Sequence, residues 1–177
     1  MPSLPERVLA IDRAFSHISH AFGGALALAY HAEPRATRDI DVNVFVPPTE
    51  AREVLRLLGH LGADVAGAHE GAERDGQVRV MWDTTPVDVF FSYDPFHDAA
   101  DHGAVSVDFA DDTIRVLSAT HLTVCKAVFD RPKDWVDIDA MRAADAGIDT
   151  AEVVRWVGRI CGDRDQRFER VVAVLTT

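Results

Sequence analysis

The chain has 177 residues, 47% of them hydrophobic and 27% charged, a balance that indicates a soluble globular protein. Its net charge of −11 argues against a surface that coats nucleic acid broadly, and it suits a site in which a divalent cation neutralises carboxylates. The two cysteines make neither a disulfide framework nor a zinc knuckle. No apolar run approaches the roughly 18 residues of a membrane span, and the N-terminus lacks a signal-peptide core. We therefore expect a cytoplasmic protein that does not enter a membrane.

Helices and strands alternate at the start of the chain. Helical apolar spacing and good helix formers predict the helices, and alternating β-branched residues predict the strands. The expected elements are a helix at 4–18, a strand at 18–22, a helix at 25–32, a strand at 39–46 and a helix at 50–61.

The middle of the chain carries two pairs of short strands. Each pair is joined by a tight turn, which is typical of hairpins. The expected pairs are 77–83 with 86–93 and 105–110 with 113–117, preceded by polar loops at 67–76 and 94–103.

From Ser118 onward the pattern is helical. Four helices are expected at 118–129, 133–145, 150–161 and 164–175. The sequence therefore predicts an α/β (α+β) fold with a core at residues 1–117 and a helical region at 118–177 packed on it.

Three aspartates on two predicted strands form a candidate metal site. Asp39 and Asp41 share one face of their strand because residues i and i+2 point the same way. Asp88 lies in PVDVFF, where a lone acidic side chain is unexpected among apolar neighbours. Carboxylate oxygens are the ligands that Mg²⁺ prefers, usually together with substrate phosphates. Taken singly, each aspartate could instead cap a turn or face solvent.

A glycine pair precedes the aspartates. Gly23 and Gly24 lie between a predicted strand and a predicted helix, where bare backbone N–H groups can approach a phosphate. A tight turn alone would need only one glycine. A phosphate cradle followed by a carboxylate pair is what phosphoryl or nucleotidyl transfer requires.

These residues resemble a known signature. The stretch FGGALALAYHAEPRATRDIDVNVF is similar to that of the nucleotidyltransferase (polymerase-β-like) superfamily, and most similar to the AbiEii and MenT type of toxin nucleotidyltransferases. The matching positions are Gly23, Gly24, Arg35, Thr37, Asp39, Asp41 and Asp88. The resemblance implies a mixed-sheet nucleotidyltransferase core followed by a helical region. The second position of the usual Gly-Ser pair is glycine here.

The resemblance extends to CKAVFDRPKDWVDIDAM, which holds the only two lysines of the chain, Lys126 and Lys133. It implies that both lysines bind the triphosphate and that Asp137, or its neighbour Asp134, is catalytic. From the residues alone, Lys126 could equally be an ion-pair partner, and the two aspartates could simply favour a helix N-terminus.

Arg35 and Thr37 either contact the nucleotide or position the strand that carries Asp39 and Asp41. The resemblance leaves both roles open.

The implied activity is Mg²⁺-dependent transfer of NMP from an NTP to tRNA or a protein, with one or two Mg²⁺ ions, or Mn²⁺, bound by the three aspartates. The implied biology is the toxin of a toxin–antitoxin pair, with a cognate antitoxin as partner. Two alternatives stay open: an antibiotic (aminoglycoside) nucleotidyltransferase, and a non-catalytic nucleotide-binding or protein-interaction module. Five arginines of the last two helices could form a stripe that binds RNA: Arg155, Arg159, Arg164, Arg167 and Arg170.

Overall fold

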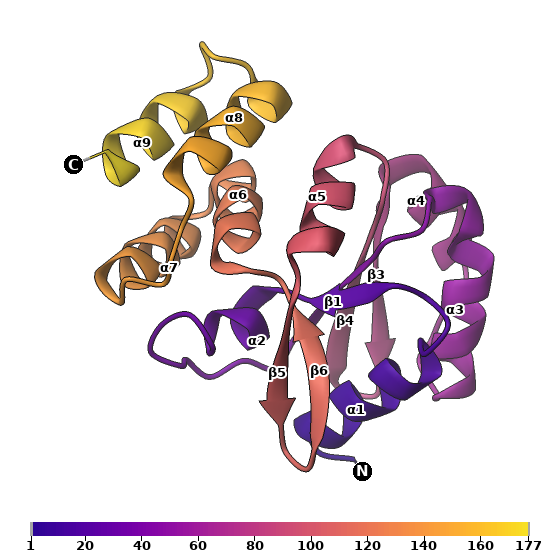
Figure 1. Cartoon of the computed structure of the whole chain (residues 1–177). Coiled ribbons are helices and arrows are strands. Elements are labelled where there is room, and N and C mark those ends of the chain that lie inside the picture. The colour runs from indigo at the N-terminus through magenta and orange to yellow at the C-terminus, as the bar shows by residue number, and fades with distance from the viewer. Residues whose placement is uncertain (1, 177) are drawn as a thin grey trace.

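The computed structural model describes residues 2–176, so Met1 and Thr177, the ends of the two expected regions, lie outside it. Its centre is a mixed six-stranded sheet in the order β3-β4-β2-β1-β6-β5 (Figure 1). The strands are β1 (His20–Phe22), β2 (Ile40–Val44), β3 (Gln77–Trp82), β4 (Thr85–Phe91), β5 (Val105–Phe109) and β6 (Asp112–Val116). The pairs β2–β4 and β1–β6 are parallel, and the other three pairs, including the central pair β1–β2, are antiparallel. The predicted mixed-sheet fold class is confirmed.

The helices follow the expected order, with two additions. They are α1 (Leu4–Ala14), α2 (Gly24–Leu28), α3 (Ala51–His60), α4 (Ala68–Asp75), α5 (Pro95–Gly103), α6 (Ala119–Phe129), α7 (Pro132–Ala143), α8 (Thr150–Cys161) and α9 (Gln166–Leu175). A short 3₁₀ turn, Pro48–Glu50, leads into α3.

The polar segment 67–76, which was expected to be a loop, forms α4. Gly67 and Gly76 bound the helix and both adopt positive φ (+69° and +65°), a conformation that glycine tolerates without a Cβ penalty. Ala72 is its one buried residue, so the helix has no apolar stripe by which the sequence would reveal it.

The segment 94–103, also expected to be irregular, forms α5. The Asp94 carboxylate caps its start by accepting a hydrogen bond from the Phe96 N–H (2.9 Å), and Pro95 occupies the first turn. Only Phe96 and Ala100 are buried on this helix, which again leaves little periodic signal.

The two faces of the central sheet differ in burial. Along β4, the alternate residues Val87, Val89 and Phe91 are fully buried, whereas Asp88 and Phe90 on the other face are only partly buried. This alternation follows from the two-residue period of a strand. In Figure 1, α3 and α4 lie on one side of the sheet, and α6 to α9 gather on the other.

The C-terminal helices pack around α6, which is buried along most of its length. Ser118 caps α6 by accepting a hydrogen bond from the His121 N–H, and α6 ends at Asp130 in the left-handed conformation. No strand follows β6 in the described residues, and the division into regions at residue 117 stays a prediction. No helix within residues 2–176 is long and apolar enough to cross a bilayer.

Candidate active site

Two of the three predicted aspartates lie side by side on the polar face of the sheet. β2 and β4 run parallel in a register that pairs Asp41 with Asp88. Asp39 precedes β2 by one residue, and its charge, like that of Asp88, acts on Asp41. The parallel register thus gathers three negative charges at one place.

Asp41 is the least compensated of the three. Its side chain is largely buried, and no described residue donates a hydrogen bond to it or forms an ion pair with it. Burial, reinforced by the charges of Asp88 and Asp39, raises its pKa to about 6. A carboxylate in this condition fits a bound cation, which would lower its pKa and satisfy its lone pairs.

Asp88 has a partner that the sequence analysis missed. The Arg79 guanidinium donates from Nε to Oδ1 and from Nη2 to Oδ2 of Asp88, both at 2.7 Å. Arg79 lies opposite Asp88 in the antiparallel β3–β4 hairpin, and its Nη2 is 3.9 Å from Asp39. The pairing raises the pKa of Arg79 above its ordinary value. Counting back from the predicted turn at residues 84–85 would have paired Asp88 with Met81. The turn lies at residues 83–84 instead, and this shift places Arg79 opposite Asp88.

The three carboxylates do not form a preorganised metal site. Within residues 2–176, no three His, Cys, Asp or Glu side chains are grouped closely enough to hold a metal ion. Asp39, Asp41 and Asp88 nevertheless share a sheet face and provide the oxygen ligands that Mg²⁺ prefers. Their metal-binding role stays a prediction.

The glycine pair packs directly against Asp41. The Gly23 N–H donates to the Asp41 carbonyl (2.9 Å), and Gly24 has φ +53°. A Cβ on Gly24 would lie 1.8 Å from Asp41 Oδ2, so a larger residue would displace the carboxylate. Gly24 is therefore needed for close approach to Asp41, whereas a Cβ on Gly23 would meet the Asn43 amide at 2.9 Å. The proposed role of the pair as a phosphate cradle stays a prediction.

Lys126 is buried within a charge network. Its Nζ donates to Asp137 Oδ2 (2.6 Å) and lies 3.7 Å from Asp134. Arg35 donates a fork to Asp137 (3.1 and 3.0 Å), and Arg131 donates a fork to Asp134 (2.6 and 3.1 Å). Burial favours a raised pKa for Asp137, but the hydrogen bonds from Arg35 and Lys126 hold it below its ordinary value. Three cations therefore face two carboxylates, which leaves one positive charge in excess.

Among the described residues, Thr37 and Lys133 form no hydrogen bond or ion pair with this network. Thr37 exchanges hydrogen bonds with the Asp39 backbone, accepting from its N–H (3.2 Å) and donating to its carbonyl (3.3 Å). This geometry favours the positioning role of Thr37 over substrate contact. Lys133 is exposed, and its role in binding nucleotide stays a prediction.

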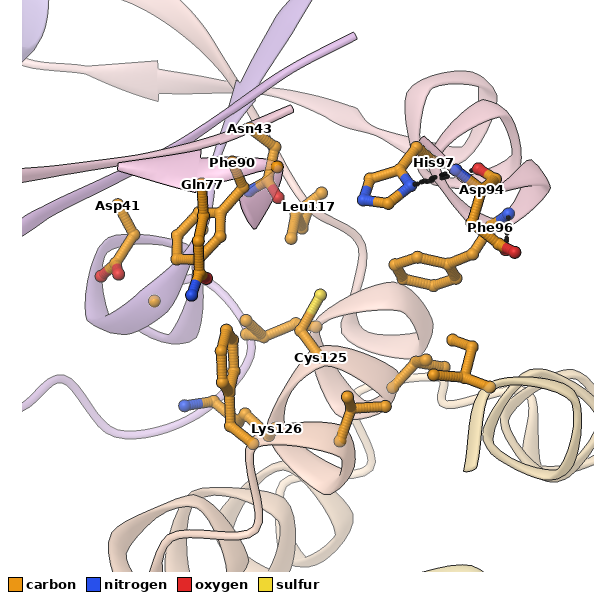
Figure 2. Close-up of a pocket in the computed structure, with 18 of the residues that line it drawn as sticks. Asp41, Asn43, Gln77, Phe90, Asp94, Phe96, His97, Leu117, Cys125 and Lys126 are labelled. Atoms are coloured by element: carbon orange, nitrogen blue, oxygen red, sulfur yellow. Dashed lines mark hydrogen bonds between the residues drawn. The ribbon is translucent and has the colours of Figure 1, made fainter. Parts of the chain in front are cut away.

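A cavity of about 370 Å³ opens between the sheet and α6. Its polar end is lined by Gly23, Gly24, Asp41, Lys126 and Arg131. Its aromatic wall is formed by Phe90, Tyr93, Phe96 and Phe129. Figure 2 shows Asp41 and Lys126 on one side of the cavity and Phe96 and His97 on the other. The cavity thus combines charged side chains and aromatic rings within one space of ligand size.

Comparisons with known proteins show the family and the fold of the chain. The family model "Nucleotidyl transferase AbiEii toxin, Type IV TA system" matches residues 7–173. No curated protein sequence matches the chain.

Solved structures share the fold. The solution structure of the antibiotic-resistance factor ANT(2")-Ia superposes with a TM-score of 0.61 at 16% identity, covering 96% of this chain and 93% of that one. The crystal structure of ANT(2")-Ia with adenylyl-2"-tobramycin gives a TM-score of 0.64 at 15% identity, covering 91% and 98%. The lincomycin-bound lincosamide adenylyltransferase LnuA gives 0.53 at 13% identity, covering 77% and 95%.

Proposed function

This chain belongs to the AbiEii nucleotidyl transferase family, and from that premise we propose that it transfers NMP from an NTP to tRNA with the help of Mg²⁺. We further propose that it is the toxin of a toxin–antitoxin pair and that a cognate antitoxin counteracts it. The observation that carries the proposal is the Asp41–Asp88 register pair, which lies beside Gly24 and the charged end of the cavity.

The chemistry requires an acceptor hydroxyl to attack the α-phosphorus of the NTP. The new O–P bond forms as the bond to the bridging oxygen breaks, so that pyrophosphate leaves and the hydroxyl proton passes to a base. Asp88 is the proposed base, and Asp39, Asp41 and Asp88 would hold Mg²⁺, which supplies positive charge to the phosphates.

The cavity suits the donor nucleotide. Its polar end places Lys126 and Arg131 near Asp41, where they would stabilise the phosphates. Its aromatic wall offers Phe90 and Phe129, whose rings meet edge to face with centroids 5.7 Å apart, as an apolar surface for the base. We therefore place the phosphates at the glycine pair and the base against these rings.

Exposed aromatic side chains at the cavity support RNA as the proposed acceptor. The cations of its lining each have an acidic partner: Lys126 with Asp137, Arg131 with Asp134 and Arg159 with Asp94. Exposed Tyr93 and Phe129 at its rim could stack on unpaired bases.

The predicted arginine stripe contributes less than expected from the sequence. Four of its members each lie within 4 Å of an acidic side chain, which compensates their charge locally: Arg155 with Glu152, Arg159 with Asp94, Arg167 with Asp165 and Arg170 with Asp130.

Incubation with each α-labelled NTP, Mg²⁺ and either total RNA or cell lysate tests the proposal. We expect label on a tRNA-sized band, lost in Asp41→Asn. Label on a protein band instead would support the protein acceptor, and label only on an added aminoglycoside would support the antibiotic alternative. No transfer to any acceptor would contradict the proposal.

A further inference from the structure

The Arg79–Asp88 ion pair occupies the carboxylate on which the proposed chemistry depends. Arg79 uses both oxygens of Asp88, each at 2.7 Å, and lies 3.9 Å from Asp39. It therefore stands between two of the three proposed metal ligands. Asp41, the third, forms no hydrogen bond or ion pair with a described residue, and only the more distant charges of Arg131 and Lys126 offset its own.

A guanidinium fork and a divalent ion compete for the same carboxylate. The fork occupies the syn lone pairs of both carboxylate oxygens. These are also the lone pairs that bind a metal most readily. A dication bound beside Arg79 would also meet a full positive charge at short range, in a site partly shielded from water. Asp88 can thus hold Arg79 tightly or a metal ion tightly, but not both.

Arg79 is free to leave. Its strand, β3, is at the edge of the sheet, and its side chain is 58% exposed, whereas the Asp88 side chain is only 16% exposed. A rotation of the long arginine side chain into solvent requires no backbone movement, so the exchange is compatible with a rigid sheet.

We propose that Arg79 is the resident counter-cation of Asp88, and that it gives way to the divalent ion when metal and nucleotide bind. Before binding, Arg79 neutralises Asp88 and limits repulsion within the group of three aspartates. When metal and nucleotide bind, Arg79 releases Asp88. Because metal must displace Arg79, its affinity for the site is lower when it binds alone, and metal binds best together with nucleotide. This inference rests on the proposed function, because it assumes that Asp88 is a metal ligand.

Mn²⁺ binding tests the exchange without any need for turnover. We would titrate Mn²⁺ alone into the wild type and into Arg79→Met, Arg79→Lys, Asp88→Asn and Arg79→Met/Asp88→Asn, following free Mn²⁺ by electron paramagnetic resonance. Arg79→Met, which keeps an unbranched apolar stem and removes the charge, should bind Mn²⁺ roughly tenfold more tightly. Arg79→Lys keeps the charge but not the fork, so its affinity should lie between the two.

Two controls isolate the site. Arg74 is 73% exposed and pairs with Asp75 at 2.7 Å, so Arg74→Met removes the same charge from an aspartate outside the site and should leave Mn²⁺ affinity unchanged. The double variant should show no gain over Asp88→Asn. In addition, Mg²⁺ with a non-hydrolysable NTP analogue should shift the Nε–H resonance of Arg79 but not that of Arg74.

The outcomes separate the inference from its premise. Equal or weaker Mn²⁺ binding by Arg79→Met, or an Arg79 resonance unmoved at saturation, would overturn the exchange and leave the proposed function standing. No Mn²⁺ binding by any variant, with or without nucleotide, would overturn the proposed function and the exchange with it.

Discussion

Lys126 and Asp137 form a buried ion pair, with Nζ 2.6 Å from Oδ2, between two helices that follow the sheet. The side chains are only 4% and 5% exposed, so neither charge can be satisfied by water alone. Because Lys126 also lines the cavity, one residue both holds α7 against α6 and delivers positive charge to the proposed phosphate site.

Removal of Lys126 should therefore cost stability as well as activity. Lys126→Met leaves Asp134 and Asp137 buried with fewer donors, and we expect a loss of about 2–3 kcal/mol in the free energy of unfolding, measured with urea. Lys126→Met/Asp137→Asn should recover part of this loss. The exposed Lys133 is the matched control, and Lys133→Met should unfold like the wild type. An unchanged unfolding curve for Lys126→Met would show that the buried pair does not stabilise the fold.

The close approach of Gly24 to Asp41 can be tested against a second glycine. Gly24→Ala combines a positive-φ penalty with a contact of 1.8 Å, whereas Gly67 has φ +69° and open space around it. Gly67→Ala should cost about 1 kcal/mol from backbone strain alone, and Gly24→Ala should cost more and abolish transfer. Equal losses in urea unfolding, with activity retained by Gly24→Ala, would mean that the site does not need this approach.

Sequence reasoning succeeded where a local residue pattern is compatible with only one kind of secondary structure. The alternation in DIDVNVFV and PVDVFF predicted two strands with aspartates on a shared face, and the structure pairs Asp41 with Asp88. It failed for α4 and α5, because these polar helices are defined by glycine conformations and an Asp94 cap rather than by an apolar stripe.

The candidate site contains features that no local pattern could have revealed. The Arg79–Asp88 pair depends on the hairpin register, and the predicted turn, one residue too late in the chain, would have placed Met81 opposite Asp88. The network that joins Arg35 to Asp137 spans 102 positions and depends on how α7 packs, which periodicity does not specify.

The raised pKa of Asp41 predicts a pH-dependent effect on stability. Burial is the main cause, and it raises the pKa of Asp41 in the folded protein to about 6, from the ordinary 3.8. The contribution of the protonated carboxyl to stability is therefore fully present below pH 3.8 and is lost as the pH rises through 6. Asp41→Asn, which stays neutral, should raise the free energy of unfolding by about 2–3 kcal/mol at pH 7.5 and about 1 kcal/mol at pH 4.5 in metal-free buffer. A gain that is the same at both pH values, or a loss, would contradict this account.

The aromatic wall should bind the base and not the phosphates. Phe129→Ala should weaken NTP binding about tenfold, as expected for a lost base–aromatic contact, and leave tripolyphosphate binding unchanged in calorimetric titrations. Val136→Ala is the control, because Val136 is an exposed apolar residue on the neighbouring helix that does not line the cavity. Parallel losses for NTP and tripolyphosphate would place the phosphates, not the base, against Phe129.

The most direct test of the central claim compares the fate of two phosphates. The protein would be incubated with tRNA, Mg²⁺ and the active NTP, labelled in parallel at the α- or the γ-phosphate. NMP transfer at the Asp41–Asp88 site predicts that the α-label moves onto tRNA while the γ-label appears only in pyrophosphate, and that Asp41→Asn and Asp88→Asn abolish both signals. Label from the γ-phosphate on tRNA, or transfer that survives both substitutions, would contradict it.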